Sequence, residues 1–487
     1  MAYLIAVVAF LAVVFYLWMK TKPKNFPPGP PRFPILGSVL YLPRKYPHVV
    51  MSGKWAEKYG PVVGLMFGSR KALAVSGPKT VLEVLHRDEF QGRPVNTRVQ
   101  KMLFNKRLGL IFTDGPYWQE LRRFTLRHLR DFGYGRTSME SLIMQEVDDL
   151  IKEMRSKDTI QVHALFRIPA LNILWAMMSG TRYSRDDEEL QTILQGLDKI
   201  FRSGTQSGRF LDVFPVLRRI LPESRTYKHF VDIINNLLNF VKRTVREHEQ
   251  NLDENNPRDF IDTYLIQMRK QKTNAESIFT EEGLIVTCQD LFNAGGDSVD
   301  NTLGFCLLYM VLHPHVQSAV QRELDSVLGR DRRPTIEDKH RLHYVNAVIT
   351  EVMRINPVVA MAVPHRVVKD TTLNGYTIPK DTFVLINFWS LLHDREHWGD
   401  PEVFRPERFL DENKTFVKDE WMISFGAGKR MCLGEALARN TVFLFFTTLL
   451  QEFSFSVPED ESTPQTLPLS GMIMAPQPFS IKISRRV

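Results

Sequence analysis

The chain has 487 residues, of which 44% are hydrophobic and 24% charged, a composition that excludes a disordered or fibrous protein. The net charge of +8 is spread along the sequence, which argues against a nucleic-acid-binding face and suits a protein near anionic lipid or an acidic partner. The three cysteines form no Cys-x-x-Cys pair, which argues against a disulfide framework or a zinc site, so any cysteine chemistry falls to a single residue.

The first element is an apolar segment from Ala2 to Met19 that carries no charge and is followed at once by Lys20. Its length reaches the minimum for a membrane-spanning helix. A cleaved signal peptide would have a basic start and a small-residue cleavage site, and this segment has neither. We therefore predict a single uncleaved transmembrane anchor over residues 1–19, with the following lysines in the cytosol.

A basic, Pro-rich stretch at residues 20–40 predicts a stiff hinge before the soluble body, residues 41–487. The body begins with two β-rich runs, Val62–Phe67 and Lys71–Ser76, which are separated by a Gly-Ser-Arg turn and predict a hairpin.

From Pro78 to Pro357 the pattern is mostly helical. The longest predicted helix runs from Thr280 to His313, with Thr280 as its N-cap and Pro314 ending it. A second predicted helix, Leu342–Ile355, has one apolar face.

Strands and turns dominate after these helices. Residues Thr371–Pro379 predict a hairpin around Asn374-Gly375, Thr382–Asn387 a further strand, and Leu433–Leu450 a helix. The pattern as a whole predicts one mainly α unit with a minor β part.

The clearest chemical motif is Phe425–Gly434, where Cys432 stands at the end of a glycine-rich loop and just before a helix. Backbone N–H groups there stabilise a thiolate, small residues let a flat macrocycle approach, and Arg430 offers a cation to a carboxylate. Thiolate ligation of haem iron requires these features. The alternative is a buried cysteine with no chemical role, the usual fate of a free thiol.

This stretch resembles the cytochrome P450 signature Phe-x-x-Gly-x-Arg-x-Cys-x-Gly and matches all its fixed positions. Glu351-x-x-Arg354 and the Pro-Glu-Arg-Phe segment that contains Arg408 resemble two further motifs, in the family's order. The resemblance covers essentially the whole chain. It implies the cytochrome P450 fold, Cys432 as the iron ligand of haem b, and a structural triad of Glu351, Arg354 and Arg408. Taken alone, Glu351 and Arg354 would be an ordinary surface pair.

Four residues resemble the positions that hold the haem propionates in the family. Trp118 and Arg122 match its Trp-x-x-x-Arg pattern and share one helix face, and Arg366 and Arg430 match two later positions. The alternative for each is an exposed surface side chain.

The segment Ala294–Ser298 resembles the family's oxygen-activation motif. The resemblance implies that Asp297 and Ser298 relay protons to the dioxygen site. Two mid-helix glycines are costly and fit a helix that opens a groove, although a packing contact would also explain them. Ser298 departs from the usual threonine, and Val299 from a second hydroxyl residue, which leaves room for looser coupling.

Apolar segments that match the family's substrate-recognition regions predict a pocket for a lipophilic small molecule. Each of its residues has an ordinary core position as its alternative. The predicted pocket residues are Leu103, Phe104, Leu110, Phe292, Gly296, Val299, Val359, Val363, Met472 and Ile473.

Residues Phe90–Pro94 and Asp290–Phe305 resemble the insect P450 clan related to vertebrate drug- and steroid-metabolising families. The anchor and hinge resemble the endoplasmic-reticulum class. This likeness implies electrons from NADPH through NADPH–cytochrome P450 reductase, docked near Lys429, with cytochrome b5 as a further candidate partner.

Within that clan we favour epoxidation of a linear terpenoid such as methyl farnesoate. An ecdysteroid, a xenobiotic or an aromatic amino acid are alternative substrates. A dioxygen-independent isomerase or dehydratase and a non-catalytic haem sensor are alternative functions.

Overall fold

The computed structural model describes Val13 and residues 24–33, 36–43, 45–95, 100, 102–132, 137–202 and 225–486. Apart from Val13, the predicted anchor at residues 1–19 lies outside the described residues. Within the described residues, no single helix is long and apolar enough to cross a membrane. Glu281–Leu312 and Pro314–Leu328 meet that criterion only as a pair, bent by 108° at their junction.

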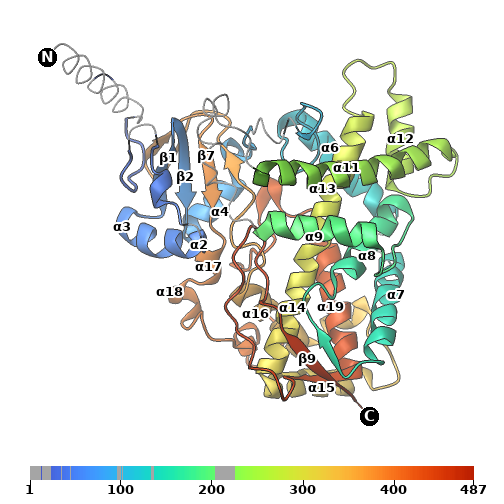
Figure 1. Ribbon diagram of the computed structural model, residues 1–487. Helices are drawn as coiled ribbons and strands as arrows, with labels where there is room; N and C mark the ends of the chain where they lie inside the picture. The colour runs from blue at the N-terminus through green and yellow to red at the C-terminus, as the bar shows by residue number, and fades with distance from the viewer. Residues whose placement is uncertain are drawn as a thin grey trace.

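A smaller β-containing part lies beside a larger helical part, as Figure 1 shows. The main sheet has the strand order β1-β2-β7-β4, built from β1 (Val62–Phe67), β2 (Arg70–Val75), β7 (Phe383–Ile386) and β4 (His365–Arg366). Strands β1 and β2 are antiparallel with Val62 opposite Val75, which confirms the predicted hairpin. Strand β7 is parallel to β2, so residues more than 300 positions apart meet in one sheet.

Two smaller sheets complete the β structure. Strands β5 (Thr371–Leu373) and β6 (Tyr376–Ile378) form the second predicted hairpin, with positive φ angles at Asn374 and Gly375 in the turn. Strands β3 (Thr159–Gln161), β9 (Ser480–Arg485) and β8 (Phe453–Ser456) pair at the opposite end of the molecule.

Helices make up most of the described chain. The longer ones are α4 (Pro78–His86), α6 (Gly115–Asp131), α7 (Thr137–Met154), α8 (Arg167–Ser179), α9 (Glu188–Arg202), α11 (Arg225–Gln250), α12 (Phe260–Lys270), α13 (Glu281–Gly295), α14 (Asp297–Leu312), α15 (Pro314–Leu328), α16 (His343–Ile355) and α19 (Glu435–Glu452). The short ones are α2 (Pro47–Val50), α3 (Ala56–Tyr59), α17 (Trp389–Leu392) and α18 (Arg395–Trp398), together with single turns that include η7 (Pro406–Phe409) and η8 (Gly428–Arg430).

Helices α13 and α14 run through the middle of the helical part (Figure 1), and they correct one prediction. The single helix predicted from Thr280 to His313 is interrupted at Gly296. A Cβ atom on Gly295 would lie 2.7 Å from Leu174 Cδ2 of α8, so the glycine lets the two helices approach closely. The predicted N-cap is confirmed, since the Thr280 hydroxyl accepts the N–H of Gly283 at 3.0 Å.

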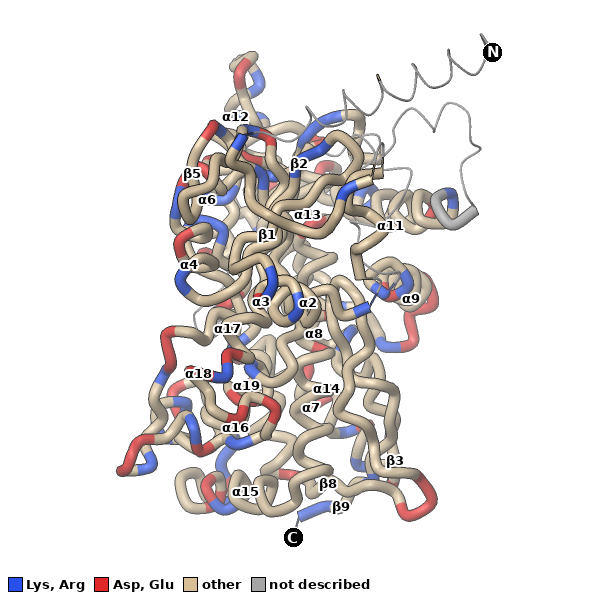
Figure 2. Tube along the Cα trace, turned by 90° about the vertical axis from the view of Figure 1, so that its left-hand side faces the viewer, with Lys and Arg blue, Asp and Glu red and all other residues tan. Residues whose placement is uncertain are grey.

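The apolar core of the helical part surrounds α14, which is buried along almost its whole length against α8, α16 and α19. Helix α16 matches its predicted range within one residue, and α19 begins and ends two residues later than predicted. Charged residues of both signs are interspersed along the outer turns in Figure 2. The predicted fold class, mainly α with a minor β part, is confirmed.

Candidate functional site

The loop before α19 is shaped by its glycines. Gly426 and Gly428 have φ angles of 76° and 68°, a region that residues with a Cβ rarely adopt. A Cβ on Gly428 would also lie 2.2 Å from the carbonyl oxygen of Leu85 in α4. The N–H of Cys432 donates to the Phe425 carbonyl at 2.9 Å, which closes the loop. The loop thus fixes Cys432 between the two parts of the molecule.

The Cys432 side chain is accessible, yet surrounding protein atoms desolvate it and raise its pKa. Glu435 adds to this rise, whereas the Gly434 N–H and the charge of Arg122 oppose it by favouring the thiolate. An accessible thiol that is also desolvated lies in the wall of a recess, not on the outer surface. Cys288 and Cys306, by contrast, are buried in the core.

A cluster of cations surrounds Trp118 beside this loop, and the structure brings three predicted residues together there. The guanidinium of Arg430 lies 3.6 Å from the Trp118 ring centre, and that of Arg122 lies 5.6 Å from it. Arg122 donates to the Met431 carbonyl at 2.6 Å. Arg430 donates to two backbone carbonyls, but its buried Nη1 has no hydrogen-bond partner among the described residues.

Sequence reasoning missed three members of this cluster: Arg93, Arg107 and His365. Desolvation and the charge of Arg430 lower the pKa of Arg93 to about 9. Desolvation also lowers the pKa of Arg430, to about 10, and that of His365 well below its usual value, so His365 is neutral. His365 follows the apolar segment that precedes Arg366, and that position was the only sequence signal for it.

Asp114 is the carboxylate that faces this cluster. Desolvation by itself would raise its pKa, but hydrogen bonds from Arg107, from the Arg93 N–H and from Arg366 outweigh it and lower the pKa to about 2. Arg366 pairs with Asp114 at 3.0 Å and with Asp381 at 2.7 Å. The charge of Arg366 is therefore already matched within the protein, unlike that of Arg430.

One face of α13 and α14 carries Asp290, Ala294 and Ser298 on successive turns. Ala294 is exposed and Ser298 partly exposed, although both lie in the middle of the molecule, so this face borders an open space. The Ser298 hydroxyl donates to the Ala294 carbonyl at 2.9 Å. At Asp290 the carboxylate accepts the N–H groups of Leu110 and Ile111 at 2.6 and 3.0 Å, which ties the loop before α6 to this face.

The Asp297 side chain points away from this open space. Its side chain is 4% exposed and contacts Arg167 of α8, with Oδ1 2.5 Å from Nε. Desolvation raises its pKa, and the Arg167 charge opposes that rise. The two predicted proton-relay residues are neighbours in sequence, but the helix turns Ser298 to the open space and Asp297 toward α8.

The predicted triad is assembled in full. Glu351 contacts Arg354 at 2.7 and 2.9 Å and Arg408 at 3.0 Å, and both Glu351 and Arg354 are completely buried. The remaining guanidinium N–H groups donate to backbone carbonyls of residues 392–403, and Arg408 also contacts the Asp400 carboxylate at 3.1 Å. This network ties α16 to η7 and to the segment before it.

The predicted pocket residues fall into two groups. Val363 is 40% exposed, and its carbonyl accepts from Arg93 of the cation cluster at 2.6 Å. The other partly exposed residues are Phe104, Leu110, Val359, Met472 and Ile473. Leu103, Gly296 and Val299 are buried, and Phe292 is a core residue whose ring contacts those of Trp175 and Phe240.

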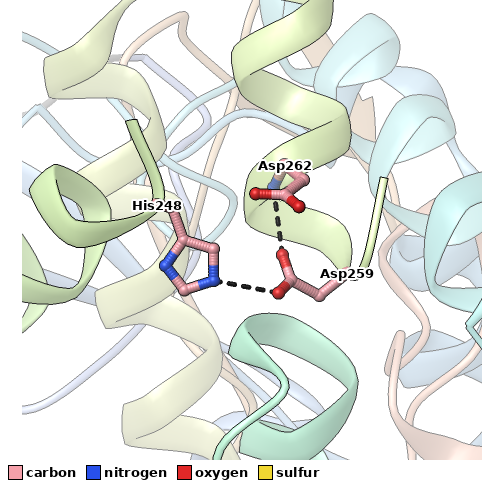
Figure 3. Close-up of side chains that lie close together, drawn as sticks. All are labelled: His248, Asp259 and Asp262. Atoms are coloured by element: carbon pink, nitrogen blue, oxygen red, sulfur yellow. Dashed lines mark hydrogen bonds and ion pairs between the residues drawn. The ribbon is translucent and has the colours of Figure 1, made fainter. Parts of the chain in front are cut away.

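A buried group outside this site, His248, Asp259 and Asp262, has the composition of a metal site (Figure 3). His248 contacts the Thr244 carbonyl at 2.7 Å through Nδ1 and the Asp259 carboxylate at 2.9 Å through Nε2. Both partners are acceptors, so both ring nitrogens carry protons. Arg258 pairs with Asp262 at 2.7 Å. These partners occupy the ligand atoms, so the group fits a closed ion-pair cluster and not a metal centre.

Comparison with known proteins places these residues in one family. The family model for cytochrome P450 matches residues 27–483, a range that includes the Cys432 loop, the cation cluster and the Glu351 network. Farnesoate epoxidase of Bombyx mori is 37% identical over 98% of both chains. Cytochrome P450 2C3 of Oryctolagus cuniculus is 36% identical over 96% of both, and cytochrome P450 2J3 of Rattus norvegicus is 37% identical over 94% of this chain and 91% of its own.

Proposed function

Because the chain belongs to the cytochrome P450 family and is a haem monooxygenase supplied with electrons by a reductase, we propose that it epoxidises a linear terpenoid ester of the methyl farnesoate type. The observation that carries this choice is the match to farnesoate epoxidase over 98% of both chains. The mammalian relatives are equally identical overall, so the substrate has to be decided by experiment.

The described residues fit a haem with two propionate carboxylates. Cys432 offers an accessible thiol, and the buried Nη1 of Arg430 has no partner among the described residues and could pair with an anionic group. We assign Cys432 as the iron ligand and Trp118, Arg122 and Arg430 as propionate-binding residues, with His365 as a further one. Arg366 acts through Asp114, which it orients. When bound, the haem supplies the iron at which dioxygen is activated.

The protein's own residues tune this site. The Gly434 N–H and the Arg122 charge favour the thiolate form of Cys432 against the desolvation that opposes it. The Ser298 hydroxyl would hand on a proton at Oγ toward the open space beside Ala294. Because serine lacks the methyl group of threonine, its rotamer is less restricted, and the Ala294 carbonyl hydrogen bond takes over part of that restraint.

Enzymes of this family use redox partners and lipophilic substrates. For this chain we assign NADPH–cytochrome P450 reductase as the partner, with cytochrome b5 as a second electron donor, and the endoplasmic reticulum membrane as the location, reached through the predicted anchor at residues 1–19. Lys429 supports docking of an acidic partner on the Cys432 side, since it is exposed and its one carboxylate contact, Asp88, is also exposed.

The test is turnover of methyl farnesoate by membrane-expressed enzyme with reductase and NADPH, with the epoxide measured by mass spectrometry. The reduced carbon-monoxide spectrum of the same sample checks that the haem is thiolate-bound. An epoxide that requires NADPH supports the proposal. A spectrally intact enzyme that yields no epoxide overturns the terpenoid assignment and directs the search to ecdysteroids, xenobiotics and aromatic amino acids.

A product that forms without NADPH would identify a dioxygen-independent isomerase or dehydratase instead. Absence of any NADPH-dependent product across all these substrate classes would favour the haem sensor.

A further inference from the structure

Two carboxamide side chains lie one turn apart on α13, the helix that borders the open space beside Ala294. Gln289 and Asn293 are separated by four positions, so they share one side of the helix. Gln289 is 5% exposed, and Asn293 is partly exposed, like Ser298. Both are polar residues in a segment whose predicted pocket residues carry no hydrogen-bonding side chain, and neither has a role in the site described above.

The oxygen atoms of both carboxamides are buried and unmatched. Gln289 Oε1 and Asn293 Oδ1 have no hydrogen-bond partner within the part of the chain that the structure describes. A buried polar oxygen without a donor costs free energy, so native proteins satisfy such atoms with protein, water or ligand. By contrast, Thr287 of the same helix donates its hydroxyl to the Gly283 carbonyl at 2.7 Å and is satisfied within α13.

The neighbouring positions of α13 show where the two carboxamides lie. Phe292, just before Asn293, packs on aromatic rings of α8 and α11, and Ala294, just after it, is exposed. Consecutive helix positions point about 100° apart, so Asn293 leaves the helix between this apolar packing and the open space. Gln289 leaves it at an angle about 40° away, one turn earlier. The pair therefore forms a polar strip beside an apolar wall.

The strip has the chemistry to bind a carbonyl group. Each carboxamide has two N–H donors and one acceptor oxygen, and a half-turn about its last side-chain bond exchanges the oxygen with the nitrogen. The position of each unmatched oxygen can therefore present an N–H group instead. The Cβ atoms of residues four apart on a helix lie about 6 Å from each other, so both amides can reach one carbonyl oxygen and occupy its two lone pairs.

We propose that Gln289 and Asn293 form a polar subsite that binds the ester carbonyl of the substrate and so sets which part of its chain reaches the space beside Ser298. This inference rests on the proposed terpenoid ester substrate. Asn293 and Gln289 lie about 8 and 14 Å before Ser298 along the helix axis, so the ester is held away from Ser298 and the apolar chain extends toward it. The two residues bind and orient the substrate, and no covalent bond changes at them.

The direct test compares methyl farnesoate with farnesyl methyl ether, the same chain with the ester carbonyl reduced to CH2. Binding to the haem-loaded enzyme is measured from the change in its absorption spectrum. The parent should bind the ester about 5- to 30-fold more tightly, because the ether lacks the acceptor for one or two hydrogen bonds. Asn293→Leu combined with Gln289→Met should raise the Kd of the ester and leave that of the ether unchanged, which removes the preference.

Thr287→Val is the matched control, since its hydroxyl is already satisfied within the same helix, and it should keep the ester preference. Stability without substrate is a second readout. The atoms removed from Gln289 and Asn293 are unmatched, so we expect both variants to unfold at the same or a higher urea concentration than the parent. A lower urea midpoint, with equally weakened binding of ester and ether, would make the carboxamides packing residues and overturn the proposal.

Two further outcomes separate the subsite from the function on which it rests. If the parent epoxidises methyl farnesoate and the variants keep its ester preference, the subsite is refuted and the proposed function stands. If a spectrally intact parent binds neither probe, the terpenoid function is refuted, and the subsite with it. If the double variant fails to bind haem, Asn293→Leu and Gln289→Met tested singly still decide, because each removes one donor.

Discussion

Two groups of buried arginines in this protein differ in whether other protein groups match their charge and accept their hydrogen bonds. In the Glu351 network, Arg354 and Arg408 share the Glu351 carboxylate, Arg408 also contacts Asp400, and their other N–H groups donate to backbone carbonyls. In the cation cluster around Trp118, the Nη1 of Arg430 and the Nε atoms of Arg93 and Arg107 are buried and have no hydrogen-bond partner in the part of the chain that the structure describes. The Glu351 network satisfies its arginines within the protein, and the cation cluster does not.

The difference supports the proposal that the Glu351 network is a scaffold and the cation cluster binds the haem propionates. Unpaired buried donors cost free energy, so a group that serves only stability satisfies them within the protein. A group that binds an anion leaves donors and positive charge unmatched until the ligand binds. This lowers the stability of the protein without its ligand. The pKa values of about 9 for Arg93 and about 10 for Arg430 reflect that cost, which arises mainly from desolvation.

We expect the largest effect from substituting Cys432, the proposed iron ligand, on the haem-binding side of this comparison. Cys432→Ser removes the thiolate, so the reduced carbon-monoxide spectrum loses its thiolate form and epoxidation falls below detection. Cys306→Ala is the control, because Cys306 is buried in the core, and it retains the spectrum. Measurable turnover by Cys432→Ser would remove this residue from the site.

Breaking the closed network affects stability most. Glu351→Ala leaves the fully buried Arg354 without its carboxylate, and we expect a loss of about 3–5 kcal/mol in the free energy of unfolding. Glu189→Ala, at the exposed pair with Arg243, costs about 0–1 kcal/mol. Urea unfolding of both variants measures the difference. Equal losses would show that burial does not distinguish the two pairs.

Loss of an arginine from the cation cluster should not lower the stability of the protein, in contrast to the loss of Glu351 from its network. Arg430→Gln removes excess positive charge, so the apoprotein unfolds at the same or a higher urea concentration than the parent. Haem binding weakens by about 10- to 100-fold, because a propionate partner is lost. Transfer of haem to an excess of apomyoglobin measures retention, and the exposed neighbour Lys429→Gln is the control. A destabilised apoprotein with unchanged haem retention would make Arg430 a scaffold residue.

We expect the smallest effect at the cluster of His248, Asp259 and Asp262 (Figure 3). Its charges are paired within the protein, but its histidine can lose a proton. The hydrogen bond and charge of Asp259 outweigh desolvation and raise the pKa of His248 above 6.5, so its stabilisation is present below pH 6.5 and is lost as the pH rises through the folded-state pKa. His248→Gln should therefore destabilise the protein by about 1 kcal/mol at acidic pH and by less at alkaline pH. A penalty that grows with pH, or a loss of stability on adding a metal chelator, would contradict this assignment.

Local chemistry made much of the fold predictable. Both hairpins, the Thr280 cap and α16 follow from turn residues, capping and apolar spacing, each decided within a few residues. The break at Gly296 was not predictable, because it lies where α8 packs against this segment, with Leu174 close to Gly295 and Leu171 close to Gly296, and local sequence does not specify that packing. Likewise Arg366 and His365 are adjacent in sequence, and only the tertiary structure decides that Arg366 pairs with Asp114 and Asp381 whereas His365 is buried and neutral.

The sequence by itself determined the family, and it predicted Cys432 as the iron ligand and Arg122 and Arg430 beside Trp118, because these depend on residue type and short spacing. Only the tertiary structure decided the direction of each charged side chain. Asp297 and Ser298 are neighbours, yet one faces Arg167 and the other the open space, since consecutive helix positions point about 100° apart. The contact between Arg167 and Asp297 likewise joins residues more than 100 positions apart, and burial there, rather than residue type, raises the pKa of Asp297.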